Sequence, residues 1–556
     1  MIKKITILAI ALLSSSLLSA QDIFDNARIT GSFQTDVQFY RPDKAIGIYD
    51  TTILGRKVGI NGYTNLTYSL GKFKAGLRYE AFMTPLSGFD PRQEGNGFPY
   101  IWASYSSDLI EITAGNFYEQ FGNGLIFRTY EEWTLGYDNS MNGMRVVLYP
   151  AKGLTLKGVY GSQRFFWQKY ERNSRGLVRG ADAELNLNEA FTSFEGSGLR
   201  LSIGGSAVSK YQRDADPIYN LPENVGAFSG RFNLGAGNFS LMTEYAYKIN
   251  DPSAANNFIY QNGQAVLSSL SYSQKGLGVV LQLKRVDNFS FKSDRTVTAN
   301  ALDINFLPPI NRTHAYSLTA KYPYATQPNG EMGLQFQVNY KIPKGTLLGG
   351  KYGTGITLNF SQVNDIVRNQ VNDTTAIMES GTLGYTSDFF KVSDHIFFRD
   401  FNIEIDKRFN SKLKGMVQYM NLLYDIATIE GHAGEEAVKV HLGVADFTYK
   451  LSSRNALRLE AQALITEQDE GDWAALMAEY TIAPKWFVAV ADQYNYGNPD
   501  EDKRNHYYTV SAGYTRESTR LALTFGRQNE GVVCVGGVCR QVPASSGFTI
   551  TLSTNF

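Results

Sequence analysis

The sequence predicts an all-β protein: a single large antiparallel transmembrane β-barrel of about 24 to 26 strands, with a lumen partly filled by loops. Three observations support this prediction. Segments that alternate apolar with polar residues recur from Ile29 to Phe556, as in strands with one lipid face and one wet face. Short turns alternate with longer polar connections between these segments, as in outer-membrane barrels. The two ends of the chain also resemble export and insertion signals.

The N-terminus predicts a cleaved secretory signal over residues 1–20. Two lysines precede an apolar run, and Leu-Ser-Ala stands before Gln21. The alternative is an uncleaved membrane anchor, but the apolar run is short for a bilayer of about 30 Å and contains three serines. We therefore expect two parts, a signal peptide at 1–20 and an outer-membrane β-barrel domain at 21–556.

The strand pattern is clear in the first part of the barrel. Within 73–82 the apolar Phe73, Leu77 and Tyr79 alternate with charged residues that we expect to face the lumen. A strand needs about 9 to 11 residues to cross, and the repeat of roughly 20 residues sets the expected strand number. The alternative is a soluble sandwich, but a chain of this length would normally divide into domains joined by linkers, and no linkers are evident.

A ring of this size leaves space that side chains alone do not span, so we expect the chain's own segments to block it. The chief candidate is 117–142, with 286–331 and 363–395 contributing, because strand alternation fails there. We expect a paired charge network, with Glu131 and Glu132 held by Arg128 or Arg145; the alternative is a solvated outer loop. The candidates for the constriction in this stretch are Glu119, Arg128, Glu131, Glu132, Asp138 and Arg145. The candidates on the wall, from alternation, are Lys74, Arg78, Glu80, Arg458, Glu460 and Gln462.

The composition gives no sign of catalysis or nucleic-acid binding. The 53 basic residues balance 53 acidic ones, which argues against a partner recruited by bulk charge. Residues 345–351 fit the start of a P-loop, but Tyr352 replaces the required Ser or Thr and a strand follows. His432 and His441 lack the spacing of a helical zinc site. We expect no catalytic, cofactor or metal site.

The last part of the chain carries two further predictions. Cys534 and Cys539 are expected to form a disulfide in the loop between the last two strands; the alternative is two free, small hydrophobic residues. The final strand ends on Phe556, which we expect to be the signal read by the barrel-assembly machinery. In the strand before it, Leu521, Leu523 and Phe525 are expected to face lipid, while Ala522, Thr524 and Gly526 face inward.

Four long, irregular stretches carry a resemblance to a known family: 284–295, 304–318, 322–333 and 342–361. They resemble motifs of a family of uncharacterised outer-membrane proteins of the Bacteroidota type, and the resemblance extends over most of the mature chain. It implies secretion, an outer-membrane location and a barrel. It lends no activity, ligand or catalytic residue to this sequence.

Two functions remain open from the sequence. In the first, the barrel is a passive or gated channel for small hydrophilic solutes in the outer membrane of a gram-negative bacterium. In the second, it is a non-conducting scaffold or accessory subunit of an outer-membrane export or assembly complex, with an outer-membrane protein partner. Both functions place the barrel in the lipid bilayer, and solute permeability separates them.

Overall fold

The computed structural model describes residues 27–49, 57–165, 176–194, 196, 198–298, 301–535 and 538–556. The predicted signal peptide and its cleavage site before Gln21 lie outside the described residues and stay predictions. Within the described ranges, no helix combines the length and the apolar character that crossing a membrane requires.

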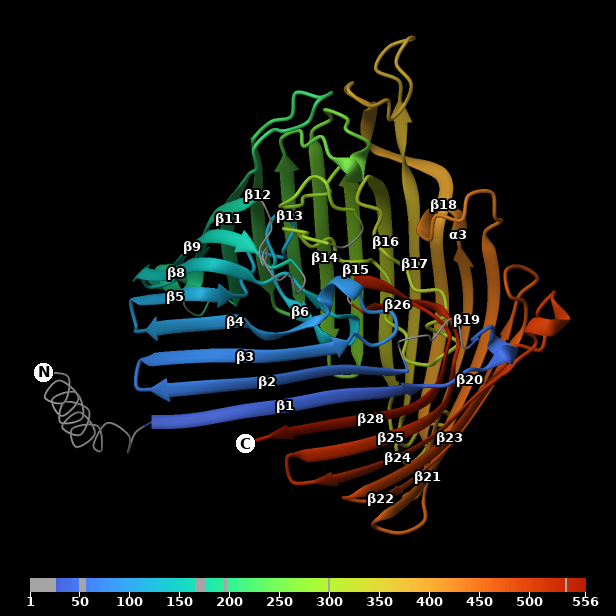
Figure 1. Cartoon of the computed structure of the whole chain (residues 1–556). Helices are drawn as coiled ribbons and strands as arrows, with labels where there is room; N and C mark the ends of the chain where they lie inside the picture. The colour runs from blue at the N-terminus through green and yellow to red at the C-terminus, as the bar shows by residue number, and fades with distance from the viewer. Residues whose placement is uncertain are drawn as a thin grey trace, which may run out of the picture.

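In the described part of the chain, 24 strands form one closed antiparallel sheet, which confirms the predicted fold class at the lower end of the expected range. Each wall strand pairs with the next wall strand along the chain, and β1 (Ala27–Tyr40) pairs with β28 (Ser545–Asn555) to close the ring (Figure 1). The other wall strands are β2 (Val58–Leu70), β3 (Phe73–Thr84), β4 (Gly95–Ser106), β5 (Ile110–Phe117), β8 (Met141–Ala151), β9 (Leu154–Gln163), β10 (Leu177–Asn186), β11 (Leu199–Tyr211), β12 (Asn224–Ala236), β13 (Phe239–Lys248), β14 (Gly263–Gln274), β15 (Leu277–Asp287), β16 (Gly330–Ile342), β17 (Thr354–Asn369), β18 (Thr386–Arg408), β19 (Leu413–Tyr424), β20 (Val438–Lys450), β21 (Asn455–Ile465), β22 (Trp473–Ile482), β23 (Trp486–Tyr494), β24 (His506–Arg516) and β25 (Thr519–Gln528).

Short elements occupy several connections. Two small hairpins are described, β6 (Glu131–Glu132) with β7 (Tyr137–Asp138), and β26 (Gly531–Val535) with β27 (Val538–Val542). The short helices are α2 (Leu187–Ala190), α3 (Ile426–Ile429), η1 (Lys44–Ile46), η2 (Pro91–Gln93), η3 (Trp133–Leu135), η4 (Thr192–Phe194), η5 (Ala254–Asn256) and η6 (Glu501–Lys503).

The two edges of the barrel differ in their connections. At the edge where β1 begins and β28 ends, here called the turn rim, most connections are tight turns (Figure 1). Gly71 between β2 and β3 has φ of 55°, and Gly276 between β14 and β15 has φ of 84°. Such left-handed positions suit hairpin turns and favour glycine. The opposite edge, here called the loop rim, carries the long connections.

Wall side chains alternate between lipid and lumen as the sequence predicts. On β3, Phe73 and Tyr79 are exposed on the outside, whereas Arg78 and Glu80 are buried within the lumen. On β25, Thr524 and Gly526 line a lumenal cavity and Leu521 is exposed. The outer surface therefore carries the apolar side chains that a bilayer requires.

The final residue completes the outer face of the ring. The Gly31 backbone N–H donates to the Phe556 carbonyl (2.8 Å), and the Phe556 N–H donates to the Gly31 carbonyl (2.9 Å). The Phe556 ring lies over Gly31, where a Cβ atom would come within 2.5 Å of it. Glycine at position 31 therefore makes room for the terminal aromatic ring. The role of Phe556 in assembly stays a prediction.

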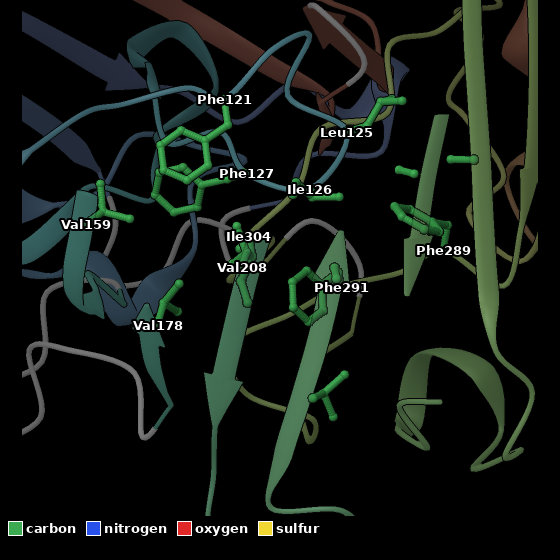
Figure 2. Close-up of a cluster of buried hydrophobic side chains, with 14 of the residues drawn as sticks. Phe121, Leu125, Ile126, Phe127, Val159, Val178, Val208, Phe289, Phe291 and Ile304 are labelled. Carbon is green, nitrogen blue, oxygen red and sulfur yellow. The ribbon is translucent and has the colours of Figure 1, made fainter. Parts of the chain in front are cut away.

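Two loop-rim connections fold into the lumen. The first plug segment, residues 118–140, joins β5 to β8; the second, residues 288–298 and 301–329, lies between β15 and β16. Their apolar side chains pack against inward-facing valines of the wall (Figure 2). The members labelled in Figure 2 are Phe121, Leu125, Ile126, Phe127, Val159, Val178, Val208, Phe289, Phe291 and Ile304. Burying this surface is the main force that docks the two segments.

The expectation that 363–395 helps to fill the lumen is wrong. These residues continue the pairing of β17 with β18 through several register shifts, and the resulting hairpin rises above the loop rim (Figure 1). Its connection packs on its neighbours: the Gly381 N–H donates to the Phe258 carbonyl (3.1 Å), and the Tyr385 hydroxyl donates to Asp287 (2.6 Å). Bulges break the period-two pattern without moving a strand out of the sheet, so lost alternation alone did not distinguish the two cases.

Candidate functional site: the plugged lumen

A buried charge network ties the first plug segment to the wall. The guanidinium of Arg78 on β3 lies 2.6 Å from Glu131 and 3.5 Å from Asp138. Arg164, which follows β9, lies 2.6 Å from both Glu80 and Asp138. Both arginines are buried. Removing one of them would leave carboxylates buried without a positive partner, which is costly.

The plug carboxylate at the centre of this network is held ionised. Burial alone would raise the pKa of Asp138, but the positive charges of Arg164 and Arg78 outweigh it, and the pKa lies below its ordinary value. The Asp138 carboxylate also accepts from the Ser140 backbone N–H (2.9 Å). Its charge therefore contributes to docking at neutral pH.

A second ion-paired group anchors the start of the first plug segment. Glu119 pairs with Arg145 on β8 and with Lys157 on β9, at 2.8 Å from the lysine. Burial acts to raise the pKa of Glu119, but the hydrogen bonds and positive charges of Lys157 and Arg145 lower it by more. The pKa of Glu119 therefore lies below its ordinary value. Arg145 also lies 3.2 Å from Glu111 on β5. Two wall strands thus hold one plug carboxylate in place, and a third strand pairs with one of its cations.

Two predicted members of the network lie elsewhere. Arg128 is stacked between the rings of Tyr130 (4.4 Å) and Phe306 (4.0 Å), and Glu132 accepts hydrogen bonds from Thr134 (2.6 Å from its hydroxyl). The predicted pairing of Glu131 and Glu132 with Arg128 or Arg145 is therefore wrong. Arg78 reaches Glu131 instead, because its position on β3 points it into the lumen.

The two plug segments join each other by backbone hydrogen bonds. The Arg128 N–H donates to the Ile304 carbonyl (2.8 Å), and the Phe306 N–H donates to the Gly124 carbonyl (2.9 Å). Gly124 has φ of 89°, which an L side chain rarely adopts. The segments therefore form one plug within the lumen, although 118–140 and 288–329 are far apart in the sequence.

The second plug segment crosses to the opposite wall. Arg312 pairs with Glu404 on β18, and the His314 ring lies 2.9 Å from Asp400 on the same strand. Lys321 pairs with Glu470 in the connection after β21. These contacts hold residues 312–321 against the wall strands from β18 onward.

The predicted wall residues divide into two groups. Arg458 on β21 lies 2.7 Å from Glu460 and 2.8 Å from Asp446, which in turn accepts from the Tyr316 hydroxyl (3.0 Å). Gln462 accepts from the Leu318 backbone N–H (3.0 Å). Lys74, by contrast, is exposed near the turn rim. Of the predicted wall residues, Arg78 and Gln462 bond to the plug directly. Glu80, Arg458 and Glu460 join the same networks through other wall side chains.

Several lumenal charges were not among the predicted site residues. They are Lys157, Arg164, Arg312, His314, Lys321, Asp400, Glu404, Asp446 and Glu470. Alternation marks Lys157 as inward-facing, but no local pattern pairs it with Glu119, which lies 38 positions away.

A cavity of about 550 Å³ remains between the second plug segment and the wall. One part of its wall side carries neutral polar side chains, Gln38, Gln493, Thr509, Thr524, Gln528, Ser545 and Thr549. Another part is apolar and aromatic, with Phe398, Met420, Leu422, Trp473 and Tyr507. Its plug side runs along 309–324, and 529–532 lies at its edge. Three cations line it, Arg312, Lys321 and Arg527, and each forms an ion pair with a carboxylate.

The backbone of the β26–β27 hairpin sets Cys534 directly opposite Cys539. The side chains of 533–539 lie outside the described set, so the disulfide stays a prediction. Among the described residues, no three His, Cys, Asp or Glu side chains come together as a metal site.

A family model described as a family of unknown function (DUF6029) matches residues 1–556. The chain belongs to this family. For this DUF6029 member, a comparison with curated protein sequences found no match.

Solved structures of similar architecture include outer-membrane proteins of Pseudomonas aeruginosa. A ferric enterobactin receptor in complex with enterobactin gives a TM-score of 0.42 at 10% identity over 95% of this chain and 81% of that chain. OpdK with vanillate gives a TM-score of 0.32 at 11% identity over 72% of this chain and 97% of that chain. At such scores these likenesses assign no ligand to the DUF6029 chain.

Proposed function

We propose that the protein is a gated channel for small hydrophilic solutes in the outer membrane of a gram-negative bacterium, and that the plug holds it nearly closed at rest. The observation that carries the proposal is the cavity of about 550 Å³ beside the second plug segment. A hydrophilic solute needs a polar path, and the wall offers amides and hydroxyls there. The barrel-assembly machinery would insert the chain by reading Phe556.

The manner of docking supports gating. Residues 312–322 are held to the wall by side-chain ion pairs and hydrogen bonds, including Arg312 with Asn402 (2.9 Å) and Tyr322 with Asp469 (2.8 Å), and by packing of Leu318 and Tyr322 on apolar wall side chains. Such contacts break and reform without unfolding the barrel, because the wall has its own backbone hydrogen bonds. Movement of this stretch would widen the cavity into a path.

Single-channel recording in planar bilayers tests the proposal. The intact protein should give a small conductance for its size, and replacement of 309–324 by a short Gly-Ser linker should raise it severalfold. The matched control replaces 371–384, the connection between β17 and β18 above the loop rim (Figure 1), and should leave the conductance unchanged. Heat-modifiable migration in gels would check that each variant is folded.

Two outcomes contradict the proposal. A large, permanently open conductance of the intact protein would favour an unplugged porin. Silence of the folded linker variant would favour the alternative, a non-conducting scaffold or accessory subunit of an outer-membrane complex.

A further inference from the structure

We propose that the cavity beside the second plug segment binds a neutral, hydroxyl-rich solute of the size of a short oligosaccharide. The inference rests on the proposed function, because it names the class of solute that the gated path would admit. The cavity volume of about 550 Å³ lies within the range of ligand pockets, about 300 to 1,000 Å³.

The wall of the cavity offers hydrogen-bonding groups that are not used by the protein. Gln493 on β23, Thr509 on β24 and Thr549 on β28 line it, and none of the three has a side-chain hydrogen-bond partner among the described residues. Amide and hydroxyl groups both donate and accept, which suits a ligand whose own hydroxyls do the same. Gln493 is the last residue but one of β23, and Thr509 and Thr549 are the fourth and fifth residues of strands that begin at the loop rim.

The charges around the cavity are already neutralised. Arg312 and Lys321 pair with Glu404 and Glu470, and Arg527 makes two hydrogen bonds to Asp43, of 2.6 and 2.9 Å. Glu530 also lines the cavity, but it is solvent-exposed at the loop rim. A charged ligand would lose hydration without gaining a free countercharge in the cavity, so a neutral ligand fits better.

An aromatic corner completes the site. The buried Trp473 ring stacks on Tyr507, with centroids 5.6 Å apart, and both residues lie in the cavity lining with Tyr322. Tyr507 is half-buried, so part of its ring faces the cavity. A sugar ring has an apolar C–H face as well as a hydroxyl edge, and pockets that combine aromatic rings with a few polar groups recognise such ligands.

Block of the ionic current by three trimers of similar size tests the class of solute. Neutral maltotriose should block reversibly and to saturation. The cationic trimer of glucosamine and the anionic trimer of galacturonate should need about tenfold higher concentrations, because the cations of the lining are paired and Glu530 is screened by solvent at the loop rim. Equal block by either charged trimer would overturn the neutral class.

Variants locate the site. Gln493→Leu and Thr549→Val should each raise the half-blocking concentration of maltotriose about fivefold, as expected from the loss of one hydrogen bond. The matched control is Gln282→Leu, on the inward face of β15 but outside the cavity lining, and it should leave block unchanged. An unchanged half-blocking concentration in both wall variants would overturn the site.

A fluorescence titration in detergent separates this inference from the proposed function, because binding near Trp473 is measured without conduction. The signal change on adding maltotriose should disappear in Trp473→Phe. Saturable binding by a protein that stays silent in bilayers would keep the site and overturn the channel. Conduction without block and without a fluorescence change would keep the channel and overturn the site.

Discussion

Two sides of the same lumen use the inward face of the barrel differently. On the sealed side, β9, β10 and β11 point Val159, Val178 and Val208 inward, and the plug covers all three. On the open side, β24 and β28 point Thr509 and Thr549 inward, and the plug leaves a cavity.

Valine and threonine have almost the same shape, so the difference lies in their chemistry. An apolar methyl in an aqueous lumen favours burial, whereas a hydroxyl is satisfied by water or by a solute. The residue type at inward positions therefore indicates where the plug docks and where a path remains. The experiments below alter one side and use the other as the reference, from the largest expected effect to the smallest.

The largest effect should come from the apolar core of the sealed side. Phe127 is fully buried and packs on Phe121, with ring centroids 4.9 Å apart. Phe127→Ala should cost about 3–5 kcal/mol of docking free energy, since it leaves a cavity as well as removing contacts. Proteolysis of the first plug segment and channel conductance should both increase.

The control for this change is Phe390→Ala, because Phe390 is 88% exposed above the loop rim. It should alter neither proteolysis nor conductance. If the two variants behave alike, the sealed side is not held by its apolar core.

The next effect concerns the two faces of β25 on the open side. Leu523→Arg should cost about 2–4 kcal/mol, because it places a charge against lipid near the middle of the strand. Thr524→Arg should be much milder, because its side chain points into the aqueous cavity. Urea titration of barrels folded into lipid vesicles measures both. Equal penalties would show that the facing of β25 is wrong.

A smaller effect should come from the β26–β27 hairpin, whose Val532 lines the open side. A bridge between Cys534 and Cys539 closes a very small ring and should contribute roughly 2 kcal/mol in the chain-entropy model. Thiol reagents should label Cys534 only after reduction, and Cys534→Ser should free its partner for labelling. Labelling of both cysteines in the unreduced protein would refute the bridge.

The architecture was predictable from the sequence because strand facing is a local property. A period of two in 73–82 or 519–528 is enough to assign each side chain to lipid or lumen. The plug contacts are not local: Arg164 and Glu80 are 84 positions apart, and Lys321 and Glu470 are 149 apart. Alternation shows that Glu80 points inward but not which loop residue meets it.

The irregular segments also show that local sequence patterns do not identify tertiary contacts. Lost alternation correctly indicated that most of 286–331 leaves the wall, although its two ends are paired in β15 and β16, whereas in 363–395 it reflects bulged strand pairing above the rim. A segment that folds into the lumen and a bulged strand pair both lose alternation in the sequence. They differ only in the residues that they contact in the folded protein. The cavity of the open side was likewise beyond prediction, since it depends on where the plug stops.

The smallest effect should be a loosening of the sealed side in acid. Asp138 and Glu119 have folded pKa values below their ordinary values of 3.8 and 4.5, because the nearby arginines and Lys157 outweigh burial. Their stabilisation is therefore complete above those ordinary values and is lost as the pH falls through the folded ones, by about 1.4 kcal/mol for each unit by which a pKa is lowered. Conductance should rise only below about pH 4. The double variant Asp138→Asn, Glu119→Gln should conduct more at pH 7 and respond less to acid, because its side chains no longer titrate. An acid response as large in this variant as in the wild type would mean that other groups control the sealed side.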